Sequence, residues 1–239
     1  MKTALVTGGG GAIGAAICRR FARDMKVLVA DRNGEAAERV AKEIGGTALV
    51  FDISRYDDAR RALAPHLVDI LVNNAGWDRF QNFTETKPEE WDALIDINLR
   101  GPLNMHHLVV PGMLQRGCGR IVNISSDAAR VGSSGEAVYS ACKGGIIAFS
   151  KTLAREVARK GITVNVVCPG PTDTPILRGF LGEGEAGQKV YDALVRAIPM
   201  KRVGQPEDIP GIVAFLASDE AGFITGQVIS VSGGLTMAG

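Results

Sequence analysis

The stretch ALVTGGGGAIG, residues 4–14, decides the fold. An apolar run of strand length is followed at once by four glycines, and a helical pattern begins at Ala12. Small residues at this place let backbone amides approach a pyrophosphate at a helix N-terminus. A glycine cluster alone is more often a turn, but strand, glycines and helix in this order favour nucleotide binding. The residues predicted to bind the nucleotide here are Gly8, Gly11, Ile13 and Gly14.

Beyond this stretch, short apolar runs alternate with longer segments of helical periodicity. The pattern is typical of βαβ units whose parallel sheet is covered on both faces. We predict one α/β domain, a doubly wound parallel sheet (Rossmann fold) of about seven strands. The expected strands are 4–7, 27–30, 48–51, 70–73, 120–124, 163–167 and 228–231. The expected helices are 12–23, 35–44, 57–64, 99–114, 139–160 and 209–217, the fourth of them interrupted or ended near Pro111 and Gly112.

The segment 171–200 has no clear sheet character and carries Gly179, Gly182, Gly184 and Gly187 among apolar residues. A long insertion of this kind in a compact domain is usually functional. We expect a substrate lid, with an irregular surface loop as the alternative.

Composition excludes several classes of partner. The chain has 239 residues, 46% of them hydrophobic and 22% charged, which suits a single globular domain. Its net charge of +1 offers no overall field for nucleic acid or an acidic membrane surface. The four cysteines and three histidines show no metal-ligand spacing, so no metal site is expected.

The start of the chain leaves no room for a secretory signal, and there is no apolar run long enough to span a membrane. We expect a cytoplasmic protein whose partner is a small molecule.

Asp31 stands at the end of the second expected strand, at the spacing of a carboxylate that accepts hydrogen bonds from the adenosine ribose. A 2′-phosphate about 4 Å away would meet a repulsion of about 4 kcal/mol at an effective dielectric near 20. The sequence therefore predicts NAD rather than NADP as the cofactor. Arg32 could compensate by pairing with such a phosphate. Asp31 could also cap the helix that starts near Gly34.

Two further strand ends carry candidate cofactor contacts. Asp52 could meet the adenine amino group, and Ile53 could cover a face of the ring. Asn74, Ala75 and Gly76 follow the fourth strand, where small residues suit a tight passage of backbone beside a cofactor.

Tyr139 and Lys143 are four residues apart, which places a phenol and an ammonium on one face of a helix. A nearby cation favours the phenolate, so Lys143 is expected to lower the pKa of Tyr139. Ser126 lies at the end of the fifth strand, at the sheet edge where ligands bind. Taken alone, a tyrosine and a lysine at this spacing are usually an ordinary pair on the surface of a helix. After a nucleotide-binding start and a strand-end serine, it predicts a catalytic site.

These motifs resemble those of the short-chain dehydrogenase/reductase family, and the resemblance covers essentially the whole chain. Thr7 to Gly14 is similar to the family's glycine-rich turn, and Asn73 to Gly76 to its Asn-Asn-Ala-Gly segment. Tyr139 to Lys143 is similar to its Tyr-x-x-x-Lys pair, and Pro169-Gly170 with Thr174 to its nicotinamide-side loop. Ala12 departs from the pattern, since the family usually has a glycine there, and we expect a slight shift of the turn with binding retained.

The resemblance implies an NAD-dependent oxidoreductase that interconverts a secondary alcohol and a ketone. Tyr139 would transfer the proton, Ser126 would orient the substrate oxygen, and Lys143 would hold the nicotinamide ribose. The resemblance also adds Asn98, as support for a proton-relay water. It further implies cofactor contacts by Tyr139, Lys143, Pro169, Gly170, Thr172 and Thr174.

Residues 127–136, 222–226 and 232–237 are similar to one subgroup, the 2-hydroxycyclohexanecarboxyl-CoA dehydrogenases. This implies a cyclic β-hydroxyacyl-CoA as substrate, with Arg79, Arg130, Arg178 and Lys189 as candidate CoA contacts. The alternatives are a 3-oxoacyl-thioester reductase, which commonly prefers NADPH, and an NAD-binding regulatory protein without turnover. Many members of the family are tetramers, so a homotetramer is expected.

Overall fold

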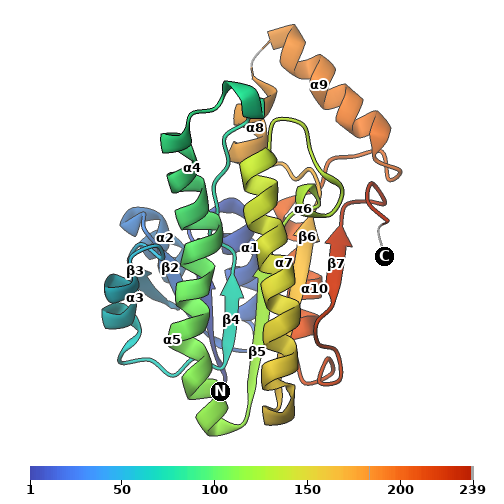
Figure 1. Ribbon diagram of the computed structural model, residues 1–239. Coiled ribbons are helices and arrows are strands. Elements are labelled where there is room, and N and C mark those ends of the chain that lie inside the picture. Colours follow the sequence, from blue (N-terminus) through green and yellow to red (C-terminus); the bar gives the residue numbers. More distant parts are fainter. Residues whose placement is uncertain (183, 238–239) are drawn as a thin grey trace.

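The structure is a computed structural model that describes residues 1–182 and 184–237, and seven parallel strands of this part form one sheet (Figure 1). Their order is β3-β2-β1-β4-β5-β6-β7. The central strands are buried along their length, as in parallel sheets that are covered on both faces. The doubly wound α/β prediction is confirmed. The strands are β1 (Thr3–Thr7), β2 (Lys26–Asp31), β3 (Thr47–Val50), β4 (Ile70–Asn73), β5 (Gly119–Ile124), β6 (Ile162–Pro169) and β7 (Val228–Val231).

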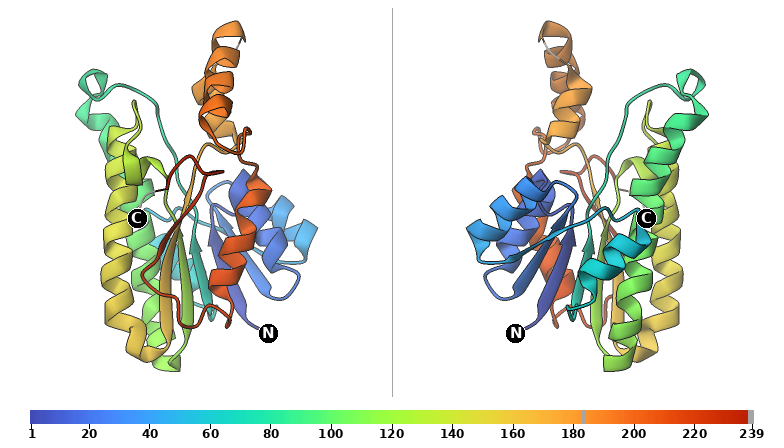
Figure 2. Two further views of the ribbon diagram at one scale, coloured as in Figure 1. Left: turned by 90° about the vertical axis from the view of Figure 1, so that its right-hand side faces the viewer. Right: turned by 90° about the vertical axis from the view of Figure 1, so that its left-hand side faces the viewer.

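Helices cover the two faces of the sheet, and the edge-on views of Figure 2 show the three layers. Successive strand residues point to opposite faces, so Val6 packs in one core and Leu5 in the other. The first core is closed by α1 (Ala12–Phe21), α2 (Gly34–Ile44) and α10 (Pro210–Ala217). The second is closed by α3 (Tyr56–Leu63), α5 (Gly101–Arg116) and α7 (Ala137–Val157).

The long helix α5 corrects one prediction, because it runs through Pro111 and Gly112 without interruption. Proline inside a helix removes one hydrogen bond and costs about 3 kcal/mol. Val109, Val110 and Met113 are buried against the sheet on both sides of it, and this packing offsets the cost. Before α5 come α4 (Pro88–Ile95), which was not predicted, and a π-helical turn, Asp96–Arg100.

The segment 171–200 is largely helical, which the sequence analysis did not predict. It contains α8 (Pro175–Leu181) and α9 (Gly184–Ala197), and α9 stands beyond the carboxyl ends of the strands, apart from the body of the domain (Figures 1 and 2). Thr174 caps α8, since its Oγ1 accepts the N–H of Leu177 at 3.3 Å. Gly187, one of the glycines of the expected lid, is buried inside α9, where a Cβ would lie 2.5 Å from the carbonyl oxygen of Gly182.

The remaining helical elements are short. They are α6 (Ala128–Val131) and three 3-10 turns, Phe83–Glu85, Ala158–Lys160 and Pro206–Asp208. None of the helices in the described part of the chain is long and apolar enough to cross a membrane.

Candidate active site

A cavity of about 760 Å³ opens at the carboxyl ends of the strands, where the strand order reverses between β1 and β4. Ligands of open α/β sheets bind at this place, outside the strand ends. Its wall joins residues that are far apart in the sequence. The predicted site residues that line it are Gly8, Gly11, Ile13, Gly14, Asp31, Arg32, Asp52, Ile53, Asn74, Ala75, Gly76, Ser126, Tyr139, Lys143, Pro169, Gly170, Thr172 and Thr174.

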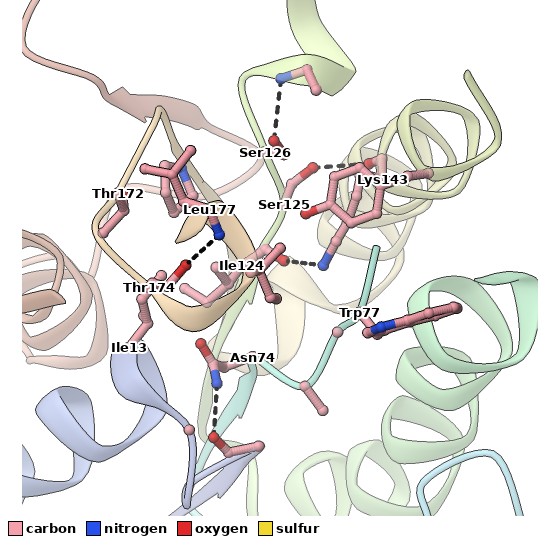
Figure 3. A pocket seen from close by; sticks show the side chains of 18 of the residues that line it. Ile13, Asn74, Trp77, Ile124, Ser125, Ser126, Lys143, Thr172, Thr174 and Leu177 are labelled. Atoms are coloured by element: carbon pink, nitrogen blue, oxygen red, sulfur yellow. Dashed lines mark hydrogen bonds between the residues drawn. The ribbon is translucent and has the colours of Figure 1, made fainter. Parts of the chain in front are cut away.

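The glycine turn leaves room that side chains would fill. A Cβ on Gly14 would lie 2.0 Å from the carbonyl oxygen of Gly8, and Gly8 itself has a φ of +63°. Asn74 braces the turn, because its Nδ2 donates to the carbonyl oxygens of Thr7 at 3.0 Å and Gly8 at 3.2 Å (Figure 3). Gly11 caps α1 without a side chain, so the first N–H groups of the helix face the cavity. This cradle fits a pyrophosphate.

Asp31 is held at the end of β2 by two backbone donors. Its Oδ2 accepts the N–H of Gly10 at 3.1 Å, and its Oδ1 accepts the N–H of Asn33 at 2.9 Å. Asn33, and not Asp31, caps α2, since its Oδ1 accepts the N–H of Ala36 at 3.1 Å. The second interpretation of Asp31, as a helix cap, is therefore wrong, and its carboxylate is available at the cavity wall.

Asp52 and Ile53 line the cavity, and Asp52 also has a local role. One of its carboxylate oxygens accepts the backbone N–H of Ser54 at 2.8 Å and the hydroxyl of Ser54 at 2.7 Å. Ile53 is buried and packs against Gly101, and a Cβ on Gly101 would lie only 2.5 Å from the side chain of Ile53.

Tyr139 and Lys143 lie one turn apart on α7, with the Lys143 Nζ 5.6 Å from the centre of the Tyr139 ring. The Lys143 Nζ donates to the carbonyl oxygen of Ile124 at 3.0 Å, and this bond ties α7 to the end of β5 (Figure 3). Lys143 is only 3% exposed, and burial lowers its pKa to about 8. Ser126 lines the same cavity beside Tyr139, and its Oγ accepts the N–H of Ala128 at 3.2 Å.

The pKa of Tyr139 differs from the expectation, because it lies above its ordinary value of 10. Burial is the largest cause, and the carboxylates of Asp78 and Glu136 add to it, whereas the nearby hydroxyl of Ser126 acts in the opposite direction. In the protein alone, Lys143 does not bring the pKa of this phenol below its usual range.

No effect of Asp78 or Glu136 on Tyr139 was predicted. Glu136 precedes Tyr139 by three residues, so helical spacing could have indicated a shared face. No pattern in the sequence relates residue 78 to residue 136, since only the folded chain brings the two loops together.

Asn98 does not line the cavity and is fully buried behind it. Its Nδ2 donates to the carbonyl oxygens of Trp77 at 2.7 Å and Leu94 at 3.0 Å, and its Oδ1 accepts the N–H of Trp77 at 3.3 Å. A Cβ on Gly76 would lie 2.9 Å from the Asn98 Oδ1 and 3.1 Å from the Lys143 Nζ. The Asn98 Oδ1 and the Lys143 Nζ therefore both lie close to Gly76. Asn98 stands on a π-helical turn, and such turns are common at functional sites.

The outer part of the cavity is apolar. Trp77 is 40% exposed and lines the cavity, so it is a wall residue and not a core residue. Phe80, from the loop after β4, contacts Phe180 of α8 with ring centres 3.9 Å apart. Leu194 of α9 completes this wall. The arrangement suits the carbon chain of a substrate.

Comparison with known proteins places the chain in a family. The family described as enoyl-(acyl carrier protein) reductase matches residues 10–236. An acetoacetyl-CoA reductase of Shinella zoogloeoides is 43% identical over 98% of both chains. A 3-oxoacyl-[acyl-carrier-protein] reductase of Salmonella typhimurium is 38% identical over 99% of this chain and 98% of its own.

A solved structure shares the fold throughout. It is a 3-oxoacyl-[acyl-carrier protein] reductase with bound NAD from Brucella melitensis, 34% identical, with a TM-score of 0.91 over 99% of this chain and 92% of that one. Sequence, fold and the order of the motifs agree. The chain therefore belongs to the short-chain dehydrogenase/reductase family and is an oxidoreductase.

Proposed function

We propose that the protein interconverts a 3-oxoacyl thioester and the corresponding 3-hydroxyacyl thioester, with NAD(H) as the hydride carrier. The observation that carries the proposal is the meeting of Ser126, Tyr139 and Lys143 at the same cavity as the glycine turn. The relatives named above are reductases of acetoacetyl-CoA and of 3-oxoacyl carrier-protein thioesters. These relatives favour a 3-oxoacyl-thioester reductase, the alternative from the sequence, over a dehydrogenase of a cyclic β-hydroxyacyl-CoA, the first choice. The cyclic acyl-CoA is a narrower member of the same class of substrates.

The glycine turn and the strand ends fit a dinucleotide, which would supply hydride chemistry when bound. Gly8, Gly11, Ile13 and Gly14 would hold the pyrophosphate, and Asp31 the adenosine ribose. Asp31 supports NAD over NADP for the electrostatic reason given above, and two related solved structures contain NAD or NADH. Asp52, Ile53 and the Asn74 to Gly76 segment would contact the adenosine half, and Pro169, Gly170, Thr172 and Thr174 the nicotinamide half.

The proton would move through Tyr139. In reduction the phenol donates its proton to the substrate oxygen, and in oxidation the phenolate removes it. Ser126 would orient that oxygen, because its hydroxyl lies beside Tyr139 in the same cavity. Lys143 and Asn98 would carry the exchange of this proton with solvent, since the Lys143 Nζ and the Asn98 Oδ1 both lie close to Gly76.

The segment 171–200 would act as a lid. Pro175, Ile176, Leu177 and Phe180 of α8 line the cavity, as does Leu194 of α9. Of the four cations proposed to contact CoA, Arg79 pairs with Glu90 at 2.6 Å and Arg178 with Asp173 at 2.7 Å, and Arg130 donates to Ser230. The exposed Lys189 on α9 is thus the better candidate for a CoA phosphate.

A homotetramer would cover the remaining apolar surface. The edge strand β7 is partly exposed at all of its residues, Val228–Val231, and edge strands of this kind are usually covered. Sedimentation of the purified protein measures the assembly directly, and a monomer would contradict this part of the proposal.

The test of the activity is a panel of acetoacetyl-CoA, 2-hydroxycyclohexanecarboxyl-CoA and free secondary alcohols, each with both nicotinamide cofactors. We expect turnover of the thioesters with NAD(H). Tyr139→Phe should lower kcat by about 10²- to 10⁴-fold while the affinity for NADH is kept. Activity only on free alcohols would overturn the thioester assignment. No turnover by the parent, with NADH still bound, would favour a regulatory protein, and full activity of Tyr139→Phe would remove the role of Tyr139.

A further inference from the structure

Two carboxyl groups that the proposed mechanism does not use face each other beside Tyr139. Asp78 lies in the loop after β4, and Glu136 is the residue before the first turn of α7. A backbone hydrogen bond of 2.9 Å from the N–H of Gln81 to the carbonyl oxygen of Gly135 joins the two loops. This bond brings the loops that carry Asp78 and Glu136 close enough for each carboxyl group to act on the other.

The surroundings of Asp78 leave one of its carboxyl oxygens without a hydrogen-bond donor. Its Oδ1 accepts the N–H of Arg79 at 2.7 Å, while its Oδ2 is buried and has no partner that carries a fixed hydrogen. Two carboxylates cannot bond to each other, because both are acceptors. A single shared proton satisfies the buried oxygen and removes the repulsion between the groups.

The surroundings decide where this proton lies. Glu136 stands at the N-terminus of a 21-residue helix, and the helix dipole stabilises its negative charge. Asp78 has no such support, and its other neighbours are Lys143 and the phenol of Tyr139. The Arg79 guanidinium is engaged with Glu90. Burial and Glu136 raise the pKa of Asp78 to about 7.

We propose that Asp78 is a positioning residue: it shares one proton with Glu136 beside Tyr139, and loss of that proton restricts the pH range in which Tyr139 can act as a base. This role rests on the proposed function, because it presumes that Tyr139 exchanges a proton with the substrate. When Asp78 loses its proton near neutral pH, the pair gains one negative charge. The groups that face Tyr139 are this pair, Lys143, Ser126 and the Cys168 thiol.

The test compares Asp78→Asn with the parent. Asparagine keeps an acceptor for the N–H of Arg79 and can donate to Glu136, and the variant lacks the second negative charge that Asp78 gains in the parent. We expect the kcat profiles for alcohol oxidation to have the same shape below about pH 7 and to diverge above it. The rising limb of the variant should lie about one pH unit lower, because Tyr139 then loses its proton against one carboxylate only. Identical limbs would overturn the proposal.

A second measurement needs no substrate and separates this proposal from the proposed function. A carboxyl whose pKa is raised in the folded state destabilises the fold as pH rises from its ordinary value, 3.8, to its folded value, about 7. Asp78→Asn removes this cost, so its Tm should exceed that of the parent more near pH 8 than near pH 5. An equal Tm difference at both pH values would overturn the shared proton, whatever the enzyme reduces.

Two further variants control for other effects. Glu136→Gln should produce the same divergence in the pH profile, and the effects of the double variant should not add, since either change alone ends the sharing of the proton. Asp92→Asn changes an exposed carboxylate on α4 in the same chemical way, and it should leave the profile and the pH dependence of Tm as in the parent. Additive effects of Asp78→Asn and Glu136→Gln on the pH profile, or a shifted pH profile in Asp92→Asn, would contradict the shared proton.

Discussion

Replacement of Asp31 by asparagine should convert a preference for NAD into one for NADP or remove the preference. The carboxylate is fixed by the N–H groups of Gly10 and Asn33, so it cannot turn away from a 2′-phosphate without breaking two hydrogen bonds. A separation of about 4 Å and an effective dielectric of about 20 give a repulsion of about 4 kcal/mol. This corresponds to about 10³ in kcat/KM, which solvent at this partly exposed site reduces to about 10². Arg32, next in the chain, should then pair with the phosphate.

The assay is the ratio of kcat/KM for the two cofactors, together with their dissociation constants from fluorescence titration. Asp52→Asn is the matched control, because it changes the same group at the end of the neighbouring strand, at a place that meets no 2′-phosphate. Its cofactor ratio should stay within about threefold of the parent, about 0.6 kcal/mol. A ratio that moves less than about tenfold in Asp31→Asn, or a parent that already prefers NADP, would refute the electrostatic reasoning.

Three further predictions follow from particular contacts. Gly14→Ala should abolish NADH binding in a protein that remains folded by circular dichroism, since the new Cβ would lie 2.0 Å from the carbonyl oxygen of Gly8. In the control Gly11→Ala the Cβ would lie 3.3 Å from the same atom, so this variant should bind NADH within a few-fold of the parent. Equal affinities of the two variants for NADH would contradict the role of the turn. Lys143→Met should lose activity yet unfold at higher urea concentration near pH 7. Burial lowers the pKa of Lys143 from 10.5 to about 8, so the charged form costs about 3 kcal/mol of stability below pH 8. That cost is lost as pH rises toward 10.5, and a gain that did not shrink by about pH 10 would contradict this account. Phe180→Ala should raise KM for an acyl thioester by about two- to tenfold, because an aromatic pair contributes about 0.5–1.5 kcal/mol, and an equal loss of NADH affinity would show that the contact with Phe80 serves the fold and not the substrate.

The strands and most helices could be predicted because their signals are local. Apolar runs of strand length occur at all seven positions, and the structure moves their ends by only one or two residues. The segment 171–200 was harder, since its glycines indicate a loop, whereas α9 contains a glycine because the neighbouring backbone of Gly182 comes too close for a side chain. The helix was expected to be interrupted or to end near Pro111 because proline removes a helical hydrogen bond. Burial of the residues on both sides of Pro111 offsets this cost, so the helix continues.

The sequence by itself determined the sheet, the glycine turn and the spacing of Tyr139 and Lys143, because each depends on residues that are neighbours along the chain. The tertiary structure alone decided the charge around Tyr139. Lys143 is near, as the spacing requires, but burial and the carboxylates of Asp78 and Glu136 raise the pKa of the phenol instead of lowering it. The electrostatic effect of one group on another depends on the distance between them in space and on their exposure to solvent. The loop that carries Asp78 comes close to Tyr139 only when β4 and β5 lie side by side in the sheet.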